Sequence, residues 1–415
     1  MKFEILLYTG ITVGSRADCK AQGTKNQVQR VMDRFVEHTP FFSSEQRAVR
    51  ARVAAFAERE IEPRAADEEQ DIDQFLRTYI ALLVEADLLR HAFALPGQAF
   101  DLRSFCIIRE ALSYSSSLAD LAFVMQGLGT YAIHLGAAEH VRDFWLARAA
   151  NGKAIAAFAL TEPDAGSDIA ALKTTARREE DAYIIDGRKR FISNAGVADF
   201  YTVFARTGGS GETRNDLSAF IVSARIPGFS VTARTEMLSP HPIGDIELKG
   251  CRVPSEDMIG QEGDGWSLAL RTLDTFRASV GAAACGMARR ALEDSLLYAK
   301  SRRQFGRALS GHQLIQEKLA DMSTELDAAR LMVFNAAFLK DTGAETSTRE
   351  ASEAKLFATE AAGRIIDQAV QIHGGTGLVR GTVVERLYRD VRALRIYEGT
   401  SEIQKLVIAG QLLKE

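Results

Sequence analysis

Cysteines and long hydrophobic runs are scarce in this chain, and their scarcity excludes several classes of protein. Four cysteines occur among 415 residues, Cys19, Cys106, Cys251 and Cys285, and no two of them form a Cys-x-x-Cys pair. This wide spacing argues against a disulfide framework and against a zinc site, and it favours a reducing, cytoplasmic setting. No run of 18 or more apolar residues exists, and residues 1–7 lack the shape of a secretory signal. We therefore expect neither a membrane span nor export.

An excess of positive charge is also missing. The 51 lysines and arginines are outnumbered by 55 aspartates and glutamates, which gives a net charge of -4. The chain therefore has no basic field that would attract nucleic acid or hold a membrane surface. No G-x-G-x-x-G motif follows a β-type run, so a nicotinamide site of the Rossmann type is unsupported.

The chain is too long for one ordinary core, and its hydrophobic pattern changes along the sequence. Residues 1–40 show no sustained period, and we interpret them as a poorly ordered extension. Helical periodicity over 41–153 predicts a first helical domain. Short β-type runs over 154–262 predict an antiparallel barrel or sandwich, and long helical patterns over 263–415 predict a four-helix bundle. The expected fold class is therefore α+β and multidomain. The β-type runs span residues 154–160, 182–185, 190–193, 200–205, 217–222, 229–233 and 243–248.

Two polar segments of the expected β domain can bind a flat ring or a phosphate. Residues 161–168 (TEPDAGSD) follow the first β-type run and offer hydroxyl and backbone N–H groups around Gly166. Further along, Phe191 and Ser193 stand two apart on a β-type run and so share one face. Two plainer interpretations stay open here: a strand-ending turn, and a core phenylalanine beside a surface serine.

Two segments of the expected bundle have similar potential. Residues 301–306 (SRRQFG) end a long helix with paired guanidinium groups, whose rigid fork suits a diphosphate. Residues 371–377 (QIHGGTG) end another helix with adjacent glycines, which let backbone approach a ligand closely. Interaction of arginine with the helix dipole and an ordinary glycine C-cap are the alternatives.

One carboxylate stands out near the end of the chain. Glu398 lies within residues 396–404 (IYEGTSEIQ), directly before a glycine and two hydroxyl residues that can cap a helix. A side chain at such a junction is aimed by a turn, as catalytic bases often are. A solvated acid at a helix entry is the alternative interpretation.

Together these segments resemble the acyl-CoA dehydrogenase flavoprotein family. The motifs T-E-P-x-A-G-S-D, F-I-S-N, R-x-Q-F-G, H-G-G-x-G and Y-E-G-T-S-E-I-Q occur in family order, and the resemblance covers residues 42–413. It implies FAD held between the β domain and the bundle, an acyl-CoA substrate and electron-transfer flavoprotein as the acceptor. It also implies a homo-oligomer, a tetramer built as a dimer of dimers, in which neighbouring subunits share the FAD site.

The resemblance also implies roles for individual residues. Glu398 would be the catalytic base, removing the α-proton of the acyl thioester while hydride leaves the β-carbon for the flavin, to give the trans-2-enoyl thioester. Implied contacts to the flavin or its diphosphate are Leu160, Thr161, Gly166, Ser167, Phe191 and Ser193, with Thr400 and Glu402 reaching FAD beside the base. Implied contacts to FAD of the neighbouring subunit are Arg302, Gln304, Phe305, Gln313, Gln371, Gly374 and Gly375. Implied substrate contacts are Ser167, Arg277, Tyr397 and Gly399; a structural ion pair is the alternative role of Arg277.

Two departures from the family pattern bear on the substrate. Pro240, His241 and Pro242 stand where many relatives have a segment containing arginine, so we expect an altered entrance for the acyl group or CoA. Residues 113–117 lack the arginine of relatives that oxidise dicarboxylic acyl groups, which favours a neutral acyl chain. An acyl-CoA oxidase, a dehydrogenase of carrier-protein thioesters and a catalytically silent flavoprotein remain alternatives on the same fold.

Overall fold

The computed structural model describes residues 35–94, 99–208, 216–344 and 347–414. Most of the expected extension lies outside these residues, but its last part does not. Helix α2 (Phe35–His38) belongs to the compact unit Arg34–Glu415, and its Val36 is only 3% exposed and joins the hydrophobic core. The predicted start of ordered structure at residue 41 is therefore too late. Val36 is a single buried residue in a polar stretch, and one apolar residue shows no helical period.

The first helical part follows from side-chain caps that the sequence places at helix starts. Ser43 and Gln46 form a capping box, in which the Ser43 hydroxyl accepts the Gln46 N–H and the Gln46 amide oxygen accepts the Ser43 N–H. Asp71, Asp101 and Ser116 cap the next three helices in the same sense. The helices are α3 (Ser44–Phe56), α4 (Ile72–Glu85), α5 (Leu102–Ser115), α6 (Ser117–Gly136) and α7 (Glu139–Ala150).

The middle of the chain folds into one sheet with the strand order β6-β7-β3-β2-β4-β5-β8, and β1 pairs with β4. The strands are β1 (Ala156–Ala159), β2 (Thr175–Glu179), β3 (Ala182–Ser193), β4 (Phe200–Arg206), β5 (Leu217–Ser223), β6 (Phe229–Arg234), β7 (Ile243–Pro254) and β8 (Met258–Ile259). Because β1 runs parallel to β4 while β3 runs antiparallel to β2 and β7, the sheet is mixed rather than purely antiparallel.

Two details of the sheet differ from the sequence pattern. The β-type runs 182–185 and 190–193 are the two ends of the single strand β3, whose polar middle pairs with β7. Strand β2 was not predicted, because most of its side chains are charged and point outward, with Ala176 as its one fully buried residue.

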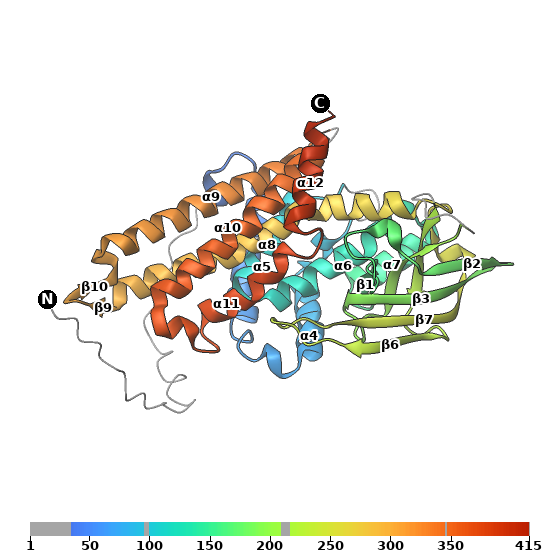
Figure 1. Cartoon of the computed structure of the whole chain (residues 1–415), viewed down its shortest axis with the longest axis horizontal. Coiled ribbons are helices and arrows are strands. Elements are labelled where there is room, and N and C mark those ends of the chain that lie inside the picture. The colour runs from blue at the N-terminus through green and yellow to red at the C-terminus, as the bar shows by residue number, and fades with distance from the viewer. Residues whose placement is uncertain (1–34, 95–98, 209–215, 345–346, 415) are drawn as a thin grey trace. The chain divides into compact units, whose positions relative to one another are not determined.

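Three long helices form the body of the C-terminal bundle, and Figure 1 shows α8, α9 and α10 running alongside one another. The helices are α8 (Gly265–Ser301), α9 (Gln313–Asp341), α10 (Thr348–His373), α11 (Val383–Val391) and α12 (Ser401–Leu412), with the short pair β9 (Arg303–Gln304) and β10 (Arg307–Ala308) between α8 and α9. Helix α5 packs closely on α8 at Gly286, where an added Cβ would lie 2.2 Å from the Glu110 carbonyl oxygen. Only glycine permits this approach.

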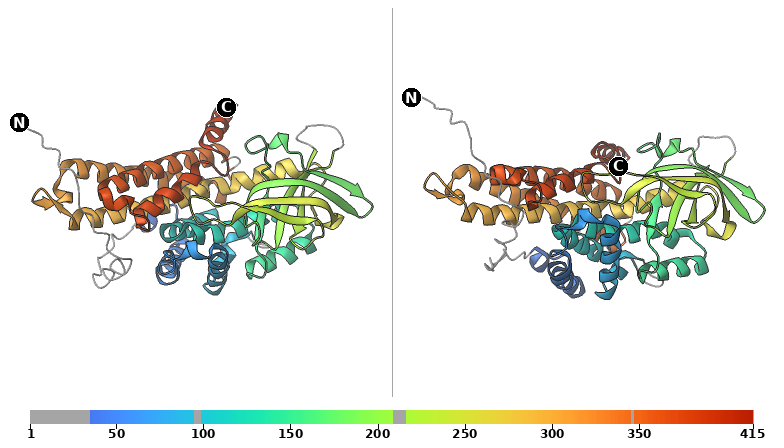
Figure 2. Two further views of the ribbon diagram at one scale, coloured as in Figure 1. Left: turned by 60° about the horizontal axis from the view of Figure 1, so that its bottom comes forward. Right: turned by 90° about the horizontal axis from the view of Figure 1, so that it is seen from below.

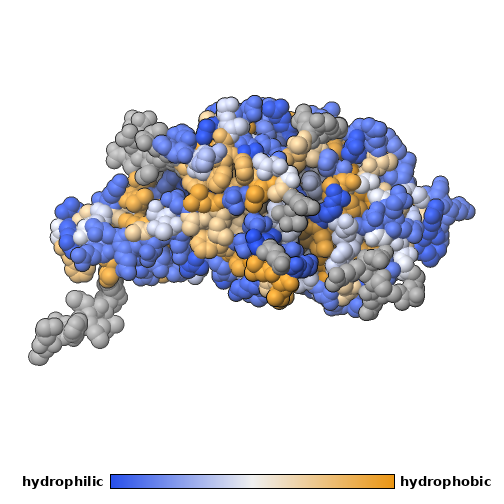
Figure 3. Space-filling view, turned by 90° about the horizontal axis from the view of Figure 1, so that it is seen from above, coloured by the Kyte–Doolittle hydropathy of each residue, from blue (hydrophilic) through white to orange (hydrophobic). Residues whose placement is uncertain are grey.

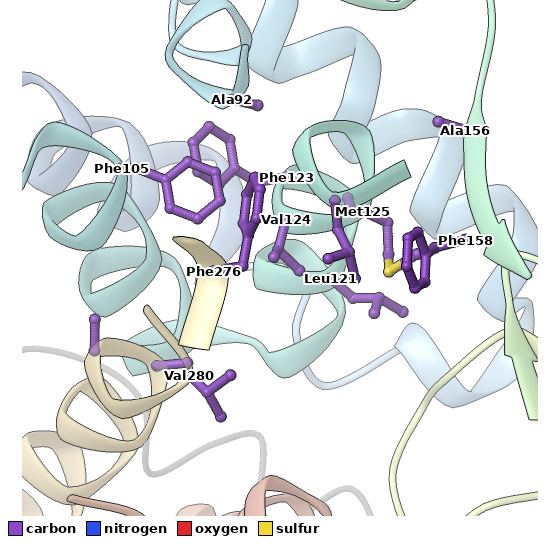
Figure 4. Close-up of a cluster of buried hydrophobic side chains, with 14 of the residues drawn as sticks. Ala92, Phe105, Leu121, Phe123, Val124, Met125, Ala156, Phe158, Phe276 and Val280 are labelled. Carbon is purple, nitrogen blue, oxygen red and sulfur yellow. The ribbon is translucent and has the colours of Figure 1, made fainter. Parts of the chain in front are cut away.

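The sheet and the helices share one core. Figure 2 shows the teal helices of residues 117–150 against one face of the sheet, and the Thr202 hydroxyl of β4 donates to the Gly129 carbonyl oxygen of α6 at 2.7 Å. Phe105, Phe123 and Phe276 join α5, α6 and α8 (Figure 4), with the Phe105 ring centroid 4.9 Å and 5.1 Å from the other two. Within the described ranges, no helix is both long enough and apolar enough to cross a membrane.

Candidate active site

The turn before α12 presents Glu398. Thr400 caps α12, because its hydroxyl accepts the Ile403 N–H at 3.3 Å. The two residues before the cap, Glu398 and Gly399, have φ angles of 52° and 88°. A glutamate in this left-handed region costs roughly 1–3 kcal/mol and persists only where its surroundings impose the conformation.

Two fully buried side chains bind the carbonyl oxygens of this turn. Lys355 of α10 donates from Nζ to the carbonyl oxygens of Tyr397 (3.1 Å) and Gly399 (2.5 Å). Gln404 of α12 donates from Nε2 to the carbonyl oxygens of Glu398 (3.3 Å) and Gly399 (2.9 Å). All three carbonyl groups of the turn are therefore bonded, and the strained conformation of Glu398 is held by buried partners on two helices.

The Glu398 carboxyl group has the environment of a general base. Its Oε2 atom is buried and has no hydrogen-bond partner among the described residues, and its backbone N–H donates to none of them either. Burial raises the pKa of Glu398, while the positive charges of Arg109 and Lys355 act in the opposite direction. A carboxylate that is desolvated and still has a free oxygen is poised to accept a proton.

Four charged side chains from four helices face Glu398: Arg109 of α5, Asp120 of α6, Arg277 of α8 and Lys355 of α10. Arg277 is buried and donates from Nη1 to Asp274 Oδ1 at 2.6 Å and to the Ser352 hydroxyl at 3.2 Å. Burial lowers the pKa of Arg277, and Asp274 and Glu398 oppose that shift. Arg277 therefore forms an ion pair with Asp274 and also lies near Glu398.

Sequence reasoning missed the ion pair of Arg109 and Asp120. The Arg109 Nε and Nη2 atoms donate to the two carboxylate oxygens of Asp120 at 2.8 Å and 2.7 Å, and Nη1 donates to the Ser279 hydroxyl at 2.8 Å. Arg109 is 1% exposed and Asp120 is 4% exposed. Burial alone would lower the pKa of Arg109, but the Asp120 charge outweighs it and raises that pKa. The only signals in the sequence are the adjacent charges Arg109 and Glu110 after the apolar residues 105–108, and Asp120 within the apolar stretch 118–125.

A second group of predicted residues meets where β1 ends beside β3. The Arg190 N–H donates to the Thr161 carbonyl oxygen at 2.9 Å, and Lys189 Nζ donates to the Leu160 carbonyl oxygen at 3.2 Å. The buried Lys189 also contacts Glu162 at 2.8 Å, and this carboxylate accepts the N–H groups of Lys173 and Thr174, directly before β2. Gly166 and Ser167 follow on the exposed part of the turn, and an added Cβ at Gly166 would meet nothing within 4 Å.

Phe191 is an open aromatic face rather than a core residue. The pairing of β3 with β7 shifts register between Lys189 and Ile192, and this irregularity leaves Phe191 with a φ of 53° and 48% exposed. Two residues on, the Ser193 hydroxyl lies 2.8 Å from His241 Nε2. Burial lowers the pKa of His241 to about 4, so this ring is neutral at pH 7. His241 is thus half-buried and bonded to Ser193.

A third group lies at the far end of α8. Its members share high exposure, and Phe305 is 93% exposed. The Tyr298 ring of α8 stacks on the His373 ring at 4.3 Å, which joins the ends of α8 and α10. Added Cβ atoms at Gly374 and Gly375 would meet nothing within 4 Å, so their backbone faces open space. The predicted residues of this group are Arg302, Gln304, Phe305, Gln313, Gln371, Gly374 and Gly375.

One chain does not bring this third group to Glu398. Arg277, which faces Glu398, and Arg302 lie about 25 residues apart along α8, which corresponds to about 38 Å of helix. Within one chain the third group is therefore separated from Arg277 and Glu398 by most of the length of α8.

Family models for the three domains of acyl-CoA dehydrogenases match this chain in order. The N-terminal domain matches residues 43–153, the middle domain residues 157–251 and the C-terminal domain residues 263–413. The chain belongs to the acyl-CoA dehydrogenase family. It is therefore an oxidoreductase of a family that dehydrogenates acyl-CoA thioesters and binds FAD.

Relatives of this acyl-CoA dehydrogenase match it over nearly their whole length. It is 40% identical to the 3-(aryl)acrylate reductase of Clostridium sporogenes, over 90% of this chain and 100% of the relative. It is 36% identical to subunit CarC of the caffeyl-CoA reductase-Etf complex of Acetobacterium woodii, over 90% and 100% of the two chains.

Solved structures of family members have the same fold. Butyryl-CoA dehydrogenase from Megasphaera elsdenii matches with a TM-score of 0.83 at 31% identity, over 90% of this chain and 99% of that chain. A glutaryl-CoA dehydrogenase from Mycobacterium smegmatis, solved in complex with FADH2, matches with a TM-score of 0.82 at 28% identity, over 90% and 96% of the two chains.

The residues present in this chain suit FAD. Phe191 is 48% exposed, and Arg190 lies 4.8 Å from its ring centroid, which leaves the opposite ring face for a flat ligand. The Ser193 hydroxyl, bonded to His241, has a second lone pair that can accept a hydrogen bond from a ligand. Gly166, Gly374 and Gly375 leave open space beside the backbone, as a diphosphate requires. The charged and aromatic side chains of the third group are solvent-exposed within one subunit, which suits contacts to a ligand of another subunit.

Replacing Glu162 with glutamine is expected to lower the free energy of unfolding by about 1–3 kcal/mol, because the buried Lys189 loses its counter-ion. Burial alone would raise the pKa of Glu162, but Lys189 and the hydrogen bonds from Thr174 and Lys173 outweigh it and hold that pKa below its usual range. The stabilisation is therefore present above the ordinary carboxyl pKa of about 4.3 and is lost as the pH falls through the lower folded pKa. Thermal unfolding at pH 7.5 and pH 4 measures both effects. The exposed Glu236→Gln variant is the control; equal destabilisation of both variants at pH 7.5 would contradict the role of Glu162.

Proposed function

We propose that Glu398 is the base of this acyl-CoA dehydrogenase and removes the α-proton of an acyl-CoA thioester. The observation that carries the proposal is the buried, unpartnered Oε2 atom on a strained turn held by Lys355 and Gln404. An apolar acyl chain entering the site would exclude more water and raise the pKa of Glu398 further, which makes the carboxylate a stronger base.

The backbone of Glu398 has a second task in this proposal. Negative charge develops on the thioester oxygen as the α-proton leaves, and a free N–H group stabilises that charge in a water-excluded site. The Glu398 N–H is available, since it donates to no other described residue. When bound, FAD supplies the acceptor for the hydride that leaves the β-carbon. The product is the trans-2-enoyl thioester.

We further propose that the FAD site is shared between subunits of a homotetramer. Leu160, Thr161, Gly166, Ser167, Phe191 and Ser193 would hold the flavin end, with Thr400 and Glu402 beside the base. The group around Arg302 and Gly375 would serve the cofactor of a neighbouring subunit, because about 38 Å of helix separates it from the base of its own chain. Figure 3 shows hydrophobic residues between hydrophilic ones on one face of the molecule, and exposed apolar side chains of the bundle include Phe305, Leu314 and Leu378.

Electron-transfer flavoprotein is the proposed electron acceptor. The name of the Acetobacterium relative, a subunit of a reductase-Etf complex, supports a partner of this kind. The three cysteines among the described residues are free and buried, which suits the proposed cytoplasmic location.

A second candidate is the same chemistry run in the opposite direction, as reduction of a 2-enoyl-CoA. The specific observation is that two relatives, 40% and 36% identical, are named as reductases. In that direction the protonated Glu398 would deliver a proton to the α-carbon. The site is the same, so the reduction potential of the electron donor or acceptor decides the direction.

A panel of acyl-CoA and enoyl-CoA thioesters tests both directions on the purified FAD-containing protein. Under anaerobic conditions we expect saturated acyl-CoAs to bleach the visible absorbance of the flavin and to yield enoyl-CoA with an artificial acceptor. Reoxidation of the reduced flavin by enoyl-CoA alone would favour the reductase. Rapid turnover with oxygen would favour an oxidase instead, and absence of bleaching by every thioester would contradict the proposed function.

A further inference from the structure

We infer that the buried Asp120 carboxylate neutralises the charge of the Arg109 guanidinium near Glu398. As a result, the acyl site binds uncharged acyl groups and rejects those that end in a carboxylate. The assignment of this region to the acyl chain rests on the proposed function, in which Glu398 meets the α-carbon of the substrate. The ion pair itself is independent of that assignment.

The pair lies within electrostatic range of the turn that presents Glu398. The charges of Arg109 and Asp120 both act on Glu398, and Arg109 also acts on Tyr397. Asp120 occupies the first turn of α6, three residues before Phe123 of the aromatic cluster in Figure 4. An acyl chain that extends from Glu398 along α6 therefore meets the ion pair and the apolar cluster.

The cations near Glu398 already have protein partners, although the buried Nε atom of Arg277 has none among the described residues. Two edges of the Arg109 guanidinium are taken by Asp120 and Ser279, Lys355 binds carbonyl oxygens of the turn, and Arg277 binds Asp274. A second carboxylate on the substrate, placed beside Arg109, would thus be buried near the Asp120 and Glu398 carboxylates while the Arg109 guanidinium is already engaged, at a high desolvation cost. An uncharged acyl end meets no such penalty, and this difference is a source of specificity.

Asp120→Asn tests the inference, because asparagine keeps the shape of the side chain and removes its charge. Pentanoyl-CoA and glutaryl-CoA are matched probes, since both have five acyl carbons and only glutaryl-CoA ends in a carboxylate. We expect Asp120→Asn to bind glutaryl-CoA more tightly than the wild type does. The association constant of pentanoyl-CoA divided by that of glutaryl-CoA should therefore fall at least about tenfold. Calorimetry on FAD-containing enzyme in a Glu398→Gln background measures binding without turnover.

The pH profile is a second readout, measured on enzyme that retains Glu398. The charged groups facing Glu398 are Arg109, Asp120, Arg277 and Lys355. Asp120 raises the pKa of Glu398, so its replacement by asparagine lowers that pKa. The base must be ionised to accept a proton, so the dehydrogenation rate falls on the acid side of its pH profile. This acid limb of the pH–rate profile is therefore expected to move to lower pH. A variant that merely loosens the fold has no reason to move this limb in that direction.

The double variant Arg109→Met, Asp120→Leu is the matched control. It removes both charges together, and it is expected to reject glutaryl-CoA as the wild type does, because no cation is set free. Should Asp120→Asn not fold, Asp120→Ser offers the same loss of charge with space for a water. The inference fails if the single variants bind glutaryl-CoA no better than wild type, or if the double variant gains the same affinity. If the wild type acts on no acyl-CoA at all, the proposed function fails instead.

Discussion

Replacing Glu398 with glutamine is expected to lower the rate of dehydrogenation by about 10³-fold, because the amide cannot accept the α-proton. Glutamine has the same shape, and the hydrogen bonds that hold the turn come to backbone carbonyl groups from Lys355 and Gln404. The variant should therefore keep its FAD and still bind acyl-CoA. Stopped-flow measurement of flavin reduction gives the rate, and calorimetry gives the affinity for the thioester.

The matched control for this experiment is Glu58→Gln, which makes the same chemical change at an exposed glutamate of the first helical part. We expect Glu58→Gln to reduce flavin at the wild-type rate. If Glu398→Gln retained more than about a tenth of the wild-type rate, the base would have to be sought on another element. Loss of FAD from the variant would instead show that the turn contributes to cofactor binding.

The position of Glu398 on a turn before a capped helix was predictable from the sequence, because everything needed to place it is local. The glycine, the capping Thr400 and the following helix lie within a few residues, and their conformational preferences set the geometry of the turn. The same holds for the capped starts of α3 to α6. The turn after β1 was likewise predictable, since its motif follows directly on a strand.

The electrostatic surroundings of Glu398 were not predictable in this way. Arg109, Asp120 and Lys355 come from three different helices, and their partners lie 11 to 170 residues away along the chain. A single buried charge in a helix looks in sequence like any solvated charge, because burial is decided by packing of distant segments. Strand β2 was not predicted for the opposite reason. Its charged side chains point outward and look like a loop in the sequence, although its backbone pairs with β3.

Lys355 and Asp120 act on Glu398 with opposite sign, which makes them a pair of probes for one group. The positive charge of Lys355 lowers the pKa of Glu398, and the negative charge of Asp120 raises it. Burial in turn lowers the pKa of Lys355 to about 8, so the lysine is still mostly charged at pH 7. Removing the Lys355 charge should therefore move the acid limb of the pH–rate profile to higher pH, and removing the Asp120 charge should move it to lower pH.

Replacing Lys355 with methionine is expected to reduce the maximal rate about 10²-fold and to lower the free energy of unfolding by about 1–3 kcal/mol. Methionine fills a similar volume but donates no hydrogen bond, so the Tyr397 carbonyl oxygen loses its partner and the strained turn its main support. Loss of the positive charge also raises the pKa of Glu398, and the acid limb of the rate moves to higher pH. Flavin reduction measured from pH 5 to 9, together with thermal unfolding, reports all three effects. Lys405→Met, on the exposed side of α12, should change none of them. A Lys355→Met enzyme with wild-type rate and an unmoved acid limb would show that Gln404 alone holds the base in place.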